Sequence, residues 1–347
     1  MRGLPDNSVD AVVTDPPYGI GFMGKGWDCA VPGEDFAVEA LRVLKPGGHL
    51  IAFAATRTVH RLAVALEDAG FEIRDQIAWL QWQGFPKSHN VAIQIDKAAG
   101  AMKHRGKAHY AYAHGKDFQG RDMEKPKSMP AHKPITPDAK KWEGWGTALK
   151  PSQEPAILAR KPLEGTVAEN VLKWGVGGLN VDACRIAYGD PAWPGPTQEV
   201  GPRSSGGWQD SYVGGSLVKP IATADPGGRW PGNIYHCAKP SRSEREAGCE
   251  ELPDPSATVR DVGGAQHTKN VVLAKNHHPT VKPTALMRWL VRLVTPPGAV
   301  VLEPFCGSGT TLLAAELEGV TCFGIEREPG YCDIIRARHG GIVGEAE

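Results

Sequence analysis

Short apolar runs alternate with amphipathic stretches along most of the chain. Residues Val9–Thr14 are β-branched and apolar and are followed by turn formers, so they predict a buried strand that ends at Asp15. The same patterns predict strands at 49–54, 71–80, 299–303 and 320–325, and helices at 36–44, 59–69, 284–293 and 312–318. Strands that alternate with helices favour a mostly parallel α/β sheet.

The first predicted strand leads into Asp15-Pro16-Pro17-Tyr18. Two successive prolines cannot continue a strand ladder, so the chain leaves the sheet in a stiff turn, at the edge where ligands bind in open α/β sheets. Such a turn holds the Asp15 carboxylate beside the Pro16 carbonyl. These two acceptors suit the N–H protons of an exocyclic amino group of adenine or cytosine, and Tyr18 can stack on a base taken out of the duplex. The bland alternative is a strand followed by a Pro-Pro turn.

A second motif lies near the other end of the chain. The strand at 299–303 leads into Phe305-Cys306-Gly307-Ser308-Gly309-Thr310, and a helix follows. Glycines in such a turn let the backbone approach a nucleotide cofactor at a helix N-terminus. The next strand ends at Glu326, close to the spacing at which an acidic residue binds ribose hydroxyls. An ordinary βαβ unit is the alternative for this motif taken alone. The pattern of a phosphate-binding P-loop is absent from the sequence.

Together the two motifs resemble those of the amino-group DNA methyltransferases of the β class, in which the catalytic motif precedes the cofactor motif. The segment Asn276–Pro283, Asn-His-His-Pro-Thr-Val-Lys-Pro, resembles a further cofactor-side motif of that family. Glu303 departs from the family pattern, which usually has Asp there, but it keeps the charge.

The resemblance implies a doubly wound, mostly parallel, Rossmann-like methyltransferase sheet, circularly permuted, with an inserted recognition region. It implies direct methyl transfer from S-adenosylmethionine to a flipped base, without a metal ion. Adenine N6 is the expected target and cytosine N4 the alternative. The catalytic residues are then Asp15, Pro16, Pro17 and Tyr18, and the cofactor-binding residues are Phe305, Gly307, Gly309, Thr310, Glu326, Thr280 and Lys282.

Composition and charge agree with this interpretation. The 347-residue chain has a formal net charge of zero, which does not exclude DNA binding because a local basic surface suffices. Its seven cysteines show no Cys-x-x-Cys spacing, which indicates reduced thiols and no structural zinc. None follows a proline, as the nucleophile of a C5-cytosine methyltransferase would. Without a signal peptide or a long apolar span in this sequence, we expect a cytoplasmic protein of bacteria or phage-infected cells, a monomer or homodimer whose partner is double-stranded DNA.

Five segments are expected along the chain. A catalytic half at 1–96 is followed by a basic insert at 97–150, a final sheet strand at 151–161, a target-recognition region at 162–274 and a cofactor-binding half at 275–347. The insert is either a solvated, flexible segment or a loop that follows DNA phosphates. The recognition region shows no convincing helical periodicity. Its three exposed-looking tryptophans are Trp174, Trp208 and Trp230. The candidates for reading bases are Arg203, Gln209, Arg229 and Asn233.

Two further expectations concern the neighbourhood of the first strand. The glycine-rich stretch 19–28 is expected to form a mobile loop. Few residues precede Val9, so the third sheet strand of the family is expected to be missing, or weakly replaced by Gly340–Gly344, and the cofactor pocket to be weakened. The competing functions are a methyltransferase for RNA or protein and a non-catalytic DNA-binding protein.

Overall fold

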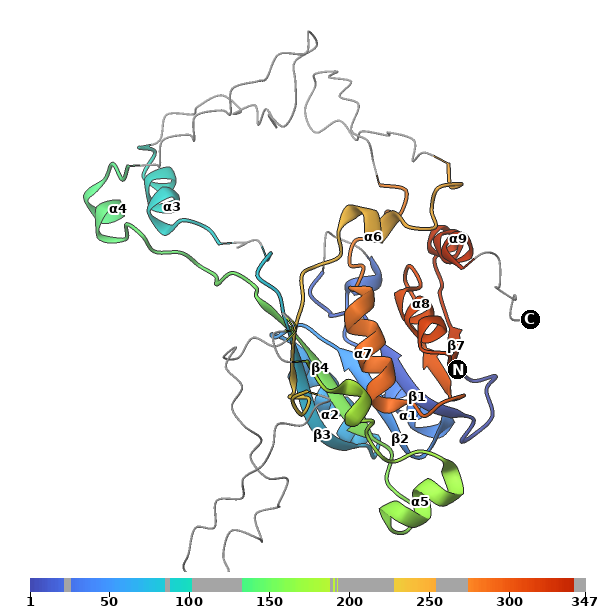
Figure 1. Ribbon diagram of the computed structural model, residues 1–347. Helices are drawn as coiled ribbons and strands as arrows, with labels where there is room; N and C mark the ends of the chain where they lie inside the picture. Colours follow the sequence, from blue (N-terminus) through green and yellow to red (C-terminus); the bar gives the residue numbers. More distant parts are fainter. Residues whose placement is uncertain are drawn as a thin grey trace, which may run out of the picture. The chain divides into compact units, whose positions relative to one another are not determined.

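A seven-stranded sheet forms the centre of the larger part of the molecule (Figure 1). The computed structural model describes residues 1–21, 26–84, 88–101, 133–187, 190, 192, 228–253 and 274–339. The chain divides into one unit of residues 1–83 and 152–347 and a second unit of residues 84–151. The strands of the first unit are β1 (Val9–Thr14), β2 (Leu44–Phe53), β3 (Glu72–Leu80), β4 (Gln153–Arg160), β5 (Ile234–His236), β6 (Val300–Glu303) and β7 (Thr321–Gly324).

The strand order is β5-β3-β4-β2-β1-β6-β7, and among these strands only β4 runs antiparallel to its neighbours. Residues from opposite ends of the sequence meet where β1 pairs with β6, with Ala11 beside Val301. The reversed direction of β4 brings its first residues to the edge where β1, β2 and β3 end. This edge therefore collects residues from distant parts of the chain.

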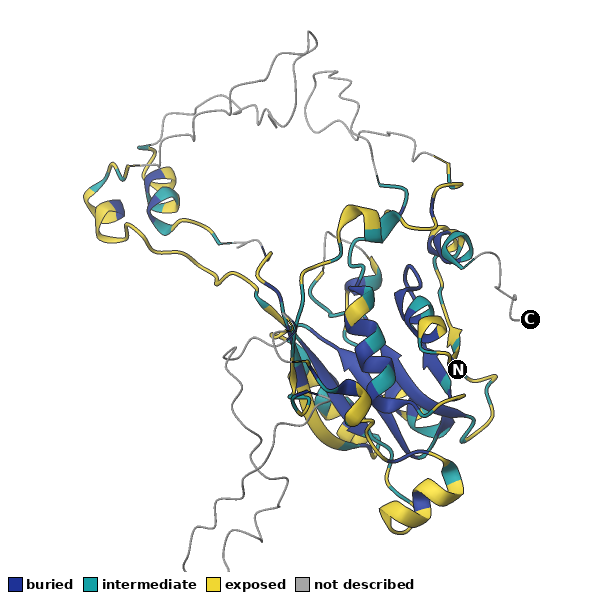
Figure 2. Ribbon diagram, in the orientation of Figure 1, coloured by how far each residue is buried: buried dark blue, intermediate teal, exposed yellow. Residues whose placement is uncertain are grey.

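Helices cover both faces of the sheet (Figures 1 and 2). On one face, α7 (Thr284–Val294) and α8 (Thr310–Leu317) bury a cluster that includes Val13, Phe53 and Leu290. On the other face, α1 (Glu34–Val43) and α2 (Val59–Asp68) bury a second cluster around Leu50 and Leu66. A final helix, α9 (Pro329–Arg338), follows β7. This is the doubly wound α/β architecture that the sequence predicts.

The predicted strands and helices are present, with ends shifted by a few residues. The largest shift is in β2, which begins at Leu44 instead of His49. Leu44 pairs with Val9 before the register shifts, so the Lys-Pro-Gly-Gly stretch belongs to the strand and not to a turn. Among the described residues, no helix combines the length and the apolar character needed to cross a membrane.

Two helices lie in 162–274, a region whose sequence shows no convincing helical periodicity. Helix α5 (Val167–Trp174) begins with a complete capping box, in which Thr166 and Glu169 bond each other's backbone N–H. Asn170 is buried and its amide donates to the carbonyls of Pro46 and Val176. Short α6 (Arg242–Glu246) also lies in this region. Local caps and tertiary contacts stabilise these helices, and neither produces a long periodic pattern.

The second unit contains α3 (Val91–Ala98) and α4 (Pro137–Lys141). It extends over 84–151, so its first boundary precedes the predicted start of the basic insert at 97. The buried carboxylate of Asp96 joins the two helices, because it accepts hydrogen bonds from the backbone N–H groups of Ile135 and Thr136 and from the Thr136 hydroxyl.

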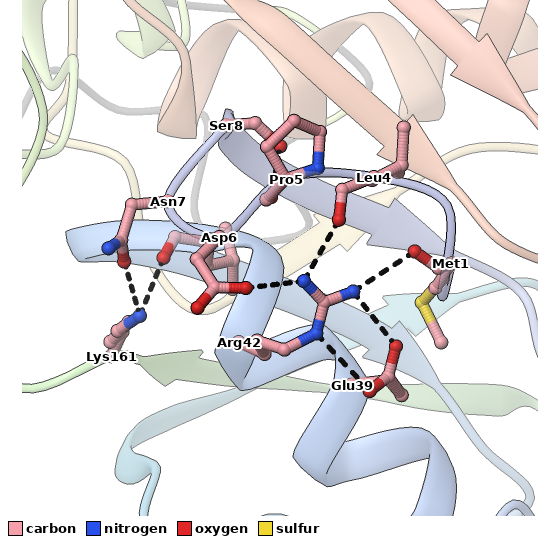
Figure 3. Close-up of polar contacts among 10 residues, drawn as sticks. Met1, Leu4, Pro5, Asp6, Asn7, Ser8, Glu39, Arg42 and Lys161 are labelled. Carbon is pink, nitrogen blue, oxygen red and sulfur yellow. Dashed lines mark hydrogen bonds and ion pairs between the residues drawn. The ribbon is translucent and has the colours of Figure 1, made fainter.

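The segment before β1 is held by Arg42 at the end of α1 (Figure 3). Its guanidinium donates to the carbonyl oxygens of Met1 (3.1 Å) and Leu4 (2.9 Å) and forms ion pairs with Asp6 and Glu39. Since β1 begins at Val9 and its opposite end carries Asp15, this network lies at the far end of β1 from the Asp-Pro-Pro-Tyr motif.

We expect Arg42→Gln to lower the midpoint of thermal unfolding by about 2–4 °C, because one side chain orders several backbone groups. The structure of the Asp-Pro-Pro-Tyr motif should not change, given the position of the network. Arg61→Gln, at an exposed arginine of α2, is the control. A midpoint no lower than that of this control would contradict the assigned role.

Candidate active site

The Asp-Pro-Pro-Tyr turn at the end of β1 is held by residues that follow it in the sequence. The carboxylate of Asp28 accepts hydrogen bonds from the backbone N–H groups of Tyr18 (2.7 Å), Gly19 (2.9 Å) and Ile20 (3.3 Å). The Thr58 hydroxyl donates to the carbonyl of Tyr18 at 2.8 Å. Asp28 is buried and ends a short 3-10 helix, Gly26–Asp28, so that end of the predicted mobile loop is instead an anchor. Residues 22–25 lie outside the described part.

Four side chains meet beyond this turn: Asp15, Tyr18, Glu154 and Lys282. The Lys282 ammonium donates to Asp15 Oδ2 and to the Tyr18 hydroxyl (3.0 Å), and it lies 3.5 Å from Glu154 Oε2. The Tyr18 hydroxyl lies 2.9 Å from Asp15 Oδ1 and 3.1 Å from Glu154 Oε2. Three separate segments of the chain thus contribute to one hydrogen-bonded cluster.

Burial and mutual attraction oppose each other in this cluster. Burial raises the pKa of Asp15, and the nearby charge of Lys282 works against that rise. Burial would lower the pKa of Lys282, but the attraction of Asp15 and Glu154 outweighs it and holds this pKa above its usual value. Burial also raises the pKa of Tyr18 well above 10, so its hydroxyl remains protonated. Lys282 is therefore a permanent cation that favours the ionised form of Asp15.

Glu303, the residue that departs from the family pattern, ties the ends of β1 and β6 together. Its buried carboxyl accepts hydrogen bonds from the hydroxyls of Thr14 and Thr311 and from the backbone N–H of Phe305. Burial raises its pKa to about 8 despite these hydrogen bonds. Because Thr14 precedes Asp15, Glu303 positions the predicted catalytic carboxylate next to the glycine turn.

The glycine turn has the backbone that its sequence predicts. Gly307 has φ +57° and Gly309 has φ +80°, and Gly309 is the N-cap of α8. A Cβ atom on Gly307 would lie 2.9 Å from Nε2 of His278, so a larger residue would meet the histidine ring. Thr310 opens the helix, while Phe305 packs against Phe36 at 5.4 Å between ring centroids.

The carboxylate of Glu326 closes this turn from the end of β7. It accepts the N–H of Gly307 at 2.7 Å and those of Arg327 and Glu328 at 2.8 Å. The backbone of the turn and the acidic side chain predicted to bind ribose are therefore in direct contact.

Two buried nitrogen atoms beside the turn lack hydrogen-bond partners among the described residues: Nδ1 of His278 and Nε of Arg338. Burial and the charge of Lys282 lower the pKa of His278 to about 3, so its ring is neutral. Arg338 also donates to the carbonyl of Ser308 at 2.6 Å. The site thus offers two unpartnered polar atoms, two glycines whose backbone a ligand can approach, and the Glu326 carboxylate. A nucleoside with an amino-acid tail needs groups of these kinds, so the residues present fit S-adenosylmethionine.

The structure brings Asp15, Tyr18 and Lys282 together and gathers Phe305, Gly307, Gly309, Thr310 and Glu326 around one turn. Thr280 lies half-buried two residues before Lys282. Lys282, which the sequence predicts to bind the cofactor, contacts Asp15. The sequence did not identify Asp28 and Glu154 as site residues. The short helix at 26–28 brings Asp28 to the site, and the antiparallel direction of β4 brings Glu154 there.

The candidate residues of the recognition region are only partly described. Arg203, Gln209 and Trp208 lie outside the described residues. Asn233 donates to Asp75 at 3.1 Å, while Arg229 forms a backbone bridge with Ile186. Trp174, expected to be exposed, is half-buried and donates to Glu164, whereas Trp230 is exposed. Within the described ranges, no group of three or more His, Cys, Asp or Glu side chains is arranged to bind a metal ion.

Comparison with known proteins decides the family. The sequence model of the DNA methylase family of N6 and N4 methyltransferases matches residues 9–337. The chain belongs to this family. It is thus an S-adenosylmethionine-dependent DNA methyltransferase that modifies an exocyclic amino group, N6 of adenine or N4 of cytosine.

Individual relatives of this DNA methylase cover nearly the whole chain. The type II methyltransferase M.HindIII of Haemophilus influenzae is 24% identical, over 98% of this chain and 92% of that protein. The solved structure of the cytosine-N4-specific PvuII DNA methyltransferase aligns with a TM-score of 0.46 and 13% identity, over 97% of this chain and 82% of the other. That of the M1.HpyAVI–SAM complex aligns with a TM-score of 0.41 and 18% identity, over 97% and 90%.

We expect Lys282→Met to move the acid limb of the pH–activity profile of this DNA methylase to higher pH. In its predicted catalytic role Asp15 would have to be ionised to accept hydrogen bonds from the amine, and loss of the neighbouring ammonium raises its pKa further. The measurement is kcat/KM for DNA as a function of pH. Lys282→Arg keeps the charge and should leave the limb nearly in place, and an unmoved limb in the Met variant would refute the assignment.

Proposed function

We propose that this DNA methylase is a site-specific N6-adenine methyltransferase that acts on double-stranded DNA. The observation that carries the proposal is the position of Asp15, whose carboxylate lies at the end of β1, bonded to Lys282 and Tyr18 and tied through Thr14 and Glu303 to the glycine turn. Aspartate at the first motif position favours adenine, and N4 of cytosine is the alternative. Similarity to a type II methyltransferase supports recognition of a specific site. We place the enzyme in the cytoplasm with its DNA, as a monomer or homodimer.

In the proposed reaction the cofactor supplies an electrophilic methyl group on a sulfonium. Asp15 and the Pro16 carbonyl would accept hydrogen bonds from the two N–H groups of the target amine, so that the nitrogen becomes pyramidal and its lone pair can attack the methyl group. The N–C bond forms as the C–S bond breaks, and the methylated nitrogen then releases one N–H proton, for which the Asp15 carboxylate is the adjacent base. Pro17 fixes the turn and the ring of Tyr18 stacks on the flipped base. Positioning and fixed charges then supply most of the rate.

The cofactor is assigned to the glycine turn and its surroundings. Backbone groups of Gly307 and Gly309 and the side chain of Thr310 bind it at the start of α8, and Phe305 and Thr280 complete the pocket. The carboxylate of Glu326 binds the ribose hydroxyls. Gly340–Gly344, which were expected to replace a further strand, lie outside the described residues.

The residue segments keep the proposed division of labour: catalysis in 1–96, the final strand at 151–161, recognition in 162–274 and cofactor binding in 275–347. We assign DNA-backbone contacts to the basic unit. Residues 84–151 contain thirteen Lys and Arg but six Asp and Glu, although the whole chain is neutral. This unit therefore concentrates the positive charge that phosphate binding needs. Exposed Trp142 and Trp145 lie beside Lys140 and Lys141 in the sequence.

The test of the reaction is nucleoside mass spectrometry of DNA from cells that express this chain. We expect N6-methyladenine with the wild-type protein and none with Asp15→Ala. N4-methylcytosine in its place would select the alternative base. If neither product forms and titration calorimetry detects no binding of S-adenosylmethionine, the chain is not an active methyltransferase and the proposal fails.

The test of the basic unit is the salt dependence of DNA affinity. Lys140→Gln/Lys141→Gln should make the slope of log K against log salt shallower by about one to two, since each lost phosphate contact removes about 0.9. Arg336→Gln is the matched control. Arg336, in the last turn of α9, forms an ion pair with Asp333 three residues before it, as Lys141 does with Asp138 in α4. If the slopes of log K against log salt are equal for the double variant and the control, Lys140 and Lys141 do not contact the DNA backbone.

A further inference from the structure

Glu154 is the one member of the four-residue cluster to which neither the motifs nor the proposed reaction gives a role. It lies at the start of β4, opposite Trp79 of β3. Its Oε2 is 3.5 Å from the Lys282 ammonium and 3.1 Å from the Tyr18 hydroxyl, and its Oε1 is 3.7 Å from Lys239. One carboxylate oxygen thus faces the catalytic residues, and the other faces a half-exposed lysine.

Both oxygens of Asp15 already have donors, which bears on how the target amine can bind. Oδ1 accepts the Tyr18 hydroxyl and Oδ2 accepts the Lys282 ammonium. Both donors also have Glu154 within reach, at 3.1 Å from the Tyr18 hydroxyl and 3.5 Å from the Lys282 nitrogen, but only Lys282 carries a positive charge. Each oxygen can accept more than one hydrogen bond, but an amine that binds at Oδ2 competes there with the ammonium for the same negative charge.

Charge makes this competition important during the reaction. The amine nitrogen gains positive charge as it takes the methyl group, and a second cation on the same carboxylate opposes that change. The opposition is strong because Lys282 is only 5% exposed and Asp15 only 17%, so water screens the charges poorly. Moving the ammonium away from Asp15 would relieve it.

We propose that Glu154 is the alternate counter-ion of Lys282, which receives the ammonium when the target amine takes its place on Asp15. The Lys282 nitrogen also lies 4.8 Å from the centre of the Phe53 ring, an aromatic face that stabilises a cation without fixing its direction. The flexible lysine stem reaches either carboxylate by a small displacement. Glu154 and Lys282 are thus positioning residues, and this inference rests on the proposed role of Asp15.

Glu154→Gln tests the inference because it keeps the shape of the side chain and removes its charge. Lys282 then remains on Asp15, and we expect the single-turnover rate of methyl transfer to fall at least about tenfold, the effect of one poorly screened charge pair. Affinity for S-adenosylmethionine should not change. The loss would not reflect protonation of Asp15, since removal of the Glu154 charge favours its ionised form. Glu164→Gln, which breaks a different Glu–Lys pair, to Lys173, is the matched control.

The decisive measurement is the double variant Glu154→Gln/Lys282→Met, assayed on the alkaline plateau of its pH profile, where Asp15 is ionised. Removal of the trapped ammonium should recover most of the rate lost in Glu154→Gln. A merely structural role of Glu154 predicts no recovery, and thermal unfolding shows whether each variant is folded.

Two results would overturn the inference: a rate for Glu154→Gln within twofold of the wild type, or a folded double variant no faster than Glu154→Gln. Failure of the proposed function looks different, because the wild-type enzyme would then form no methylated base. The inference fails on its own when the wild type methylates DNA and the double variant shows no recovery.

Discussion

The parallel pairing of β1 with β6 is the constraint on which the active site depends. It joins residues that are 290 positions apart and places the turn after β1 beside the turn after β6. The Glu303 carboxyl reinforces this junction through Thr14, Thr311 and the Phe305 backbone. Because the proposed acceptor of the amine and the proposed cofactor-binding turn follow neighbouring strands, a change at this junction would disturb both.

Electrostatics in the site follow from burial. Asp15 needs its negative charge in a place that disfavours charge, and Lys282 offsets this effect. The same lysine competes for the oxygen atom that the amine requires. A second carboxylate, Glu154, within reach of Lys282 reconciles the two requirements, since it can balance the lysine without occupying Asp15. Tyr18 contacts all three of these groups through its hydroxyl and thereby links them.

Two buried or partly buried carboxylates hold the backbone of the two turns in place. Asp28 uses its carboxylate to order three successive backbone N–H groups after the Pro-Pro turn. Glu326 does the same for the glycine turn and the loop after β7. Both residues are acidic side chains that accept hydrogen bonds from backbone N–H groups. Each therefore fixes the backbone conformation of a loop next to the proposed active site.

The sequence by itself determined the class of fold and located both motif turns, because strand periodicity, Pro-Pro and Gly-x-Gly turns are local signals. It also identified the methyltransferase family, which the match over residues 9–337 confirmed. Only the tertiary structure decided that Lys282 contacts Asp15 and that Glu154 joins them. The antiparallel direction of β4 brings Glu154 to the edge where β1 ends, and a strand pattern carries no signal of which neighbour it will meet or in which direction. Helix α5 escaped prediction for a related reason, since its capping box and the contacts of Asn170 replace a long periodic pattern.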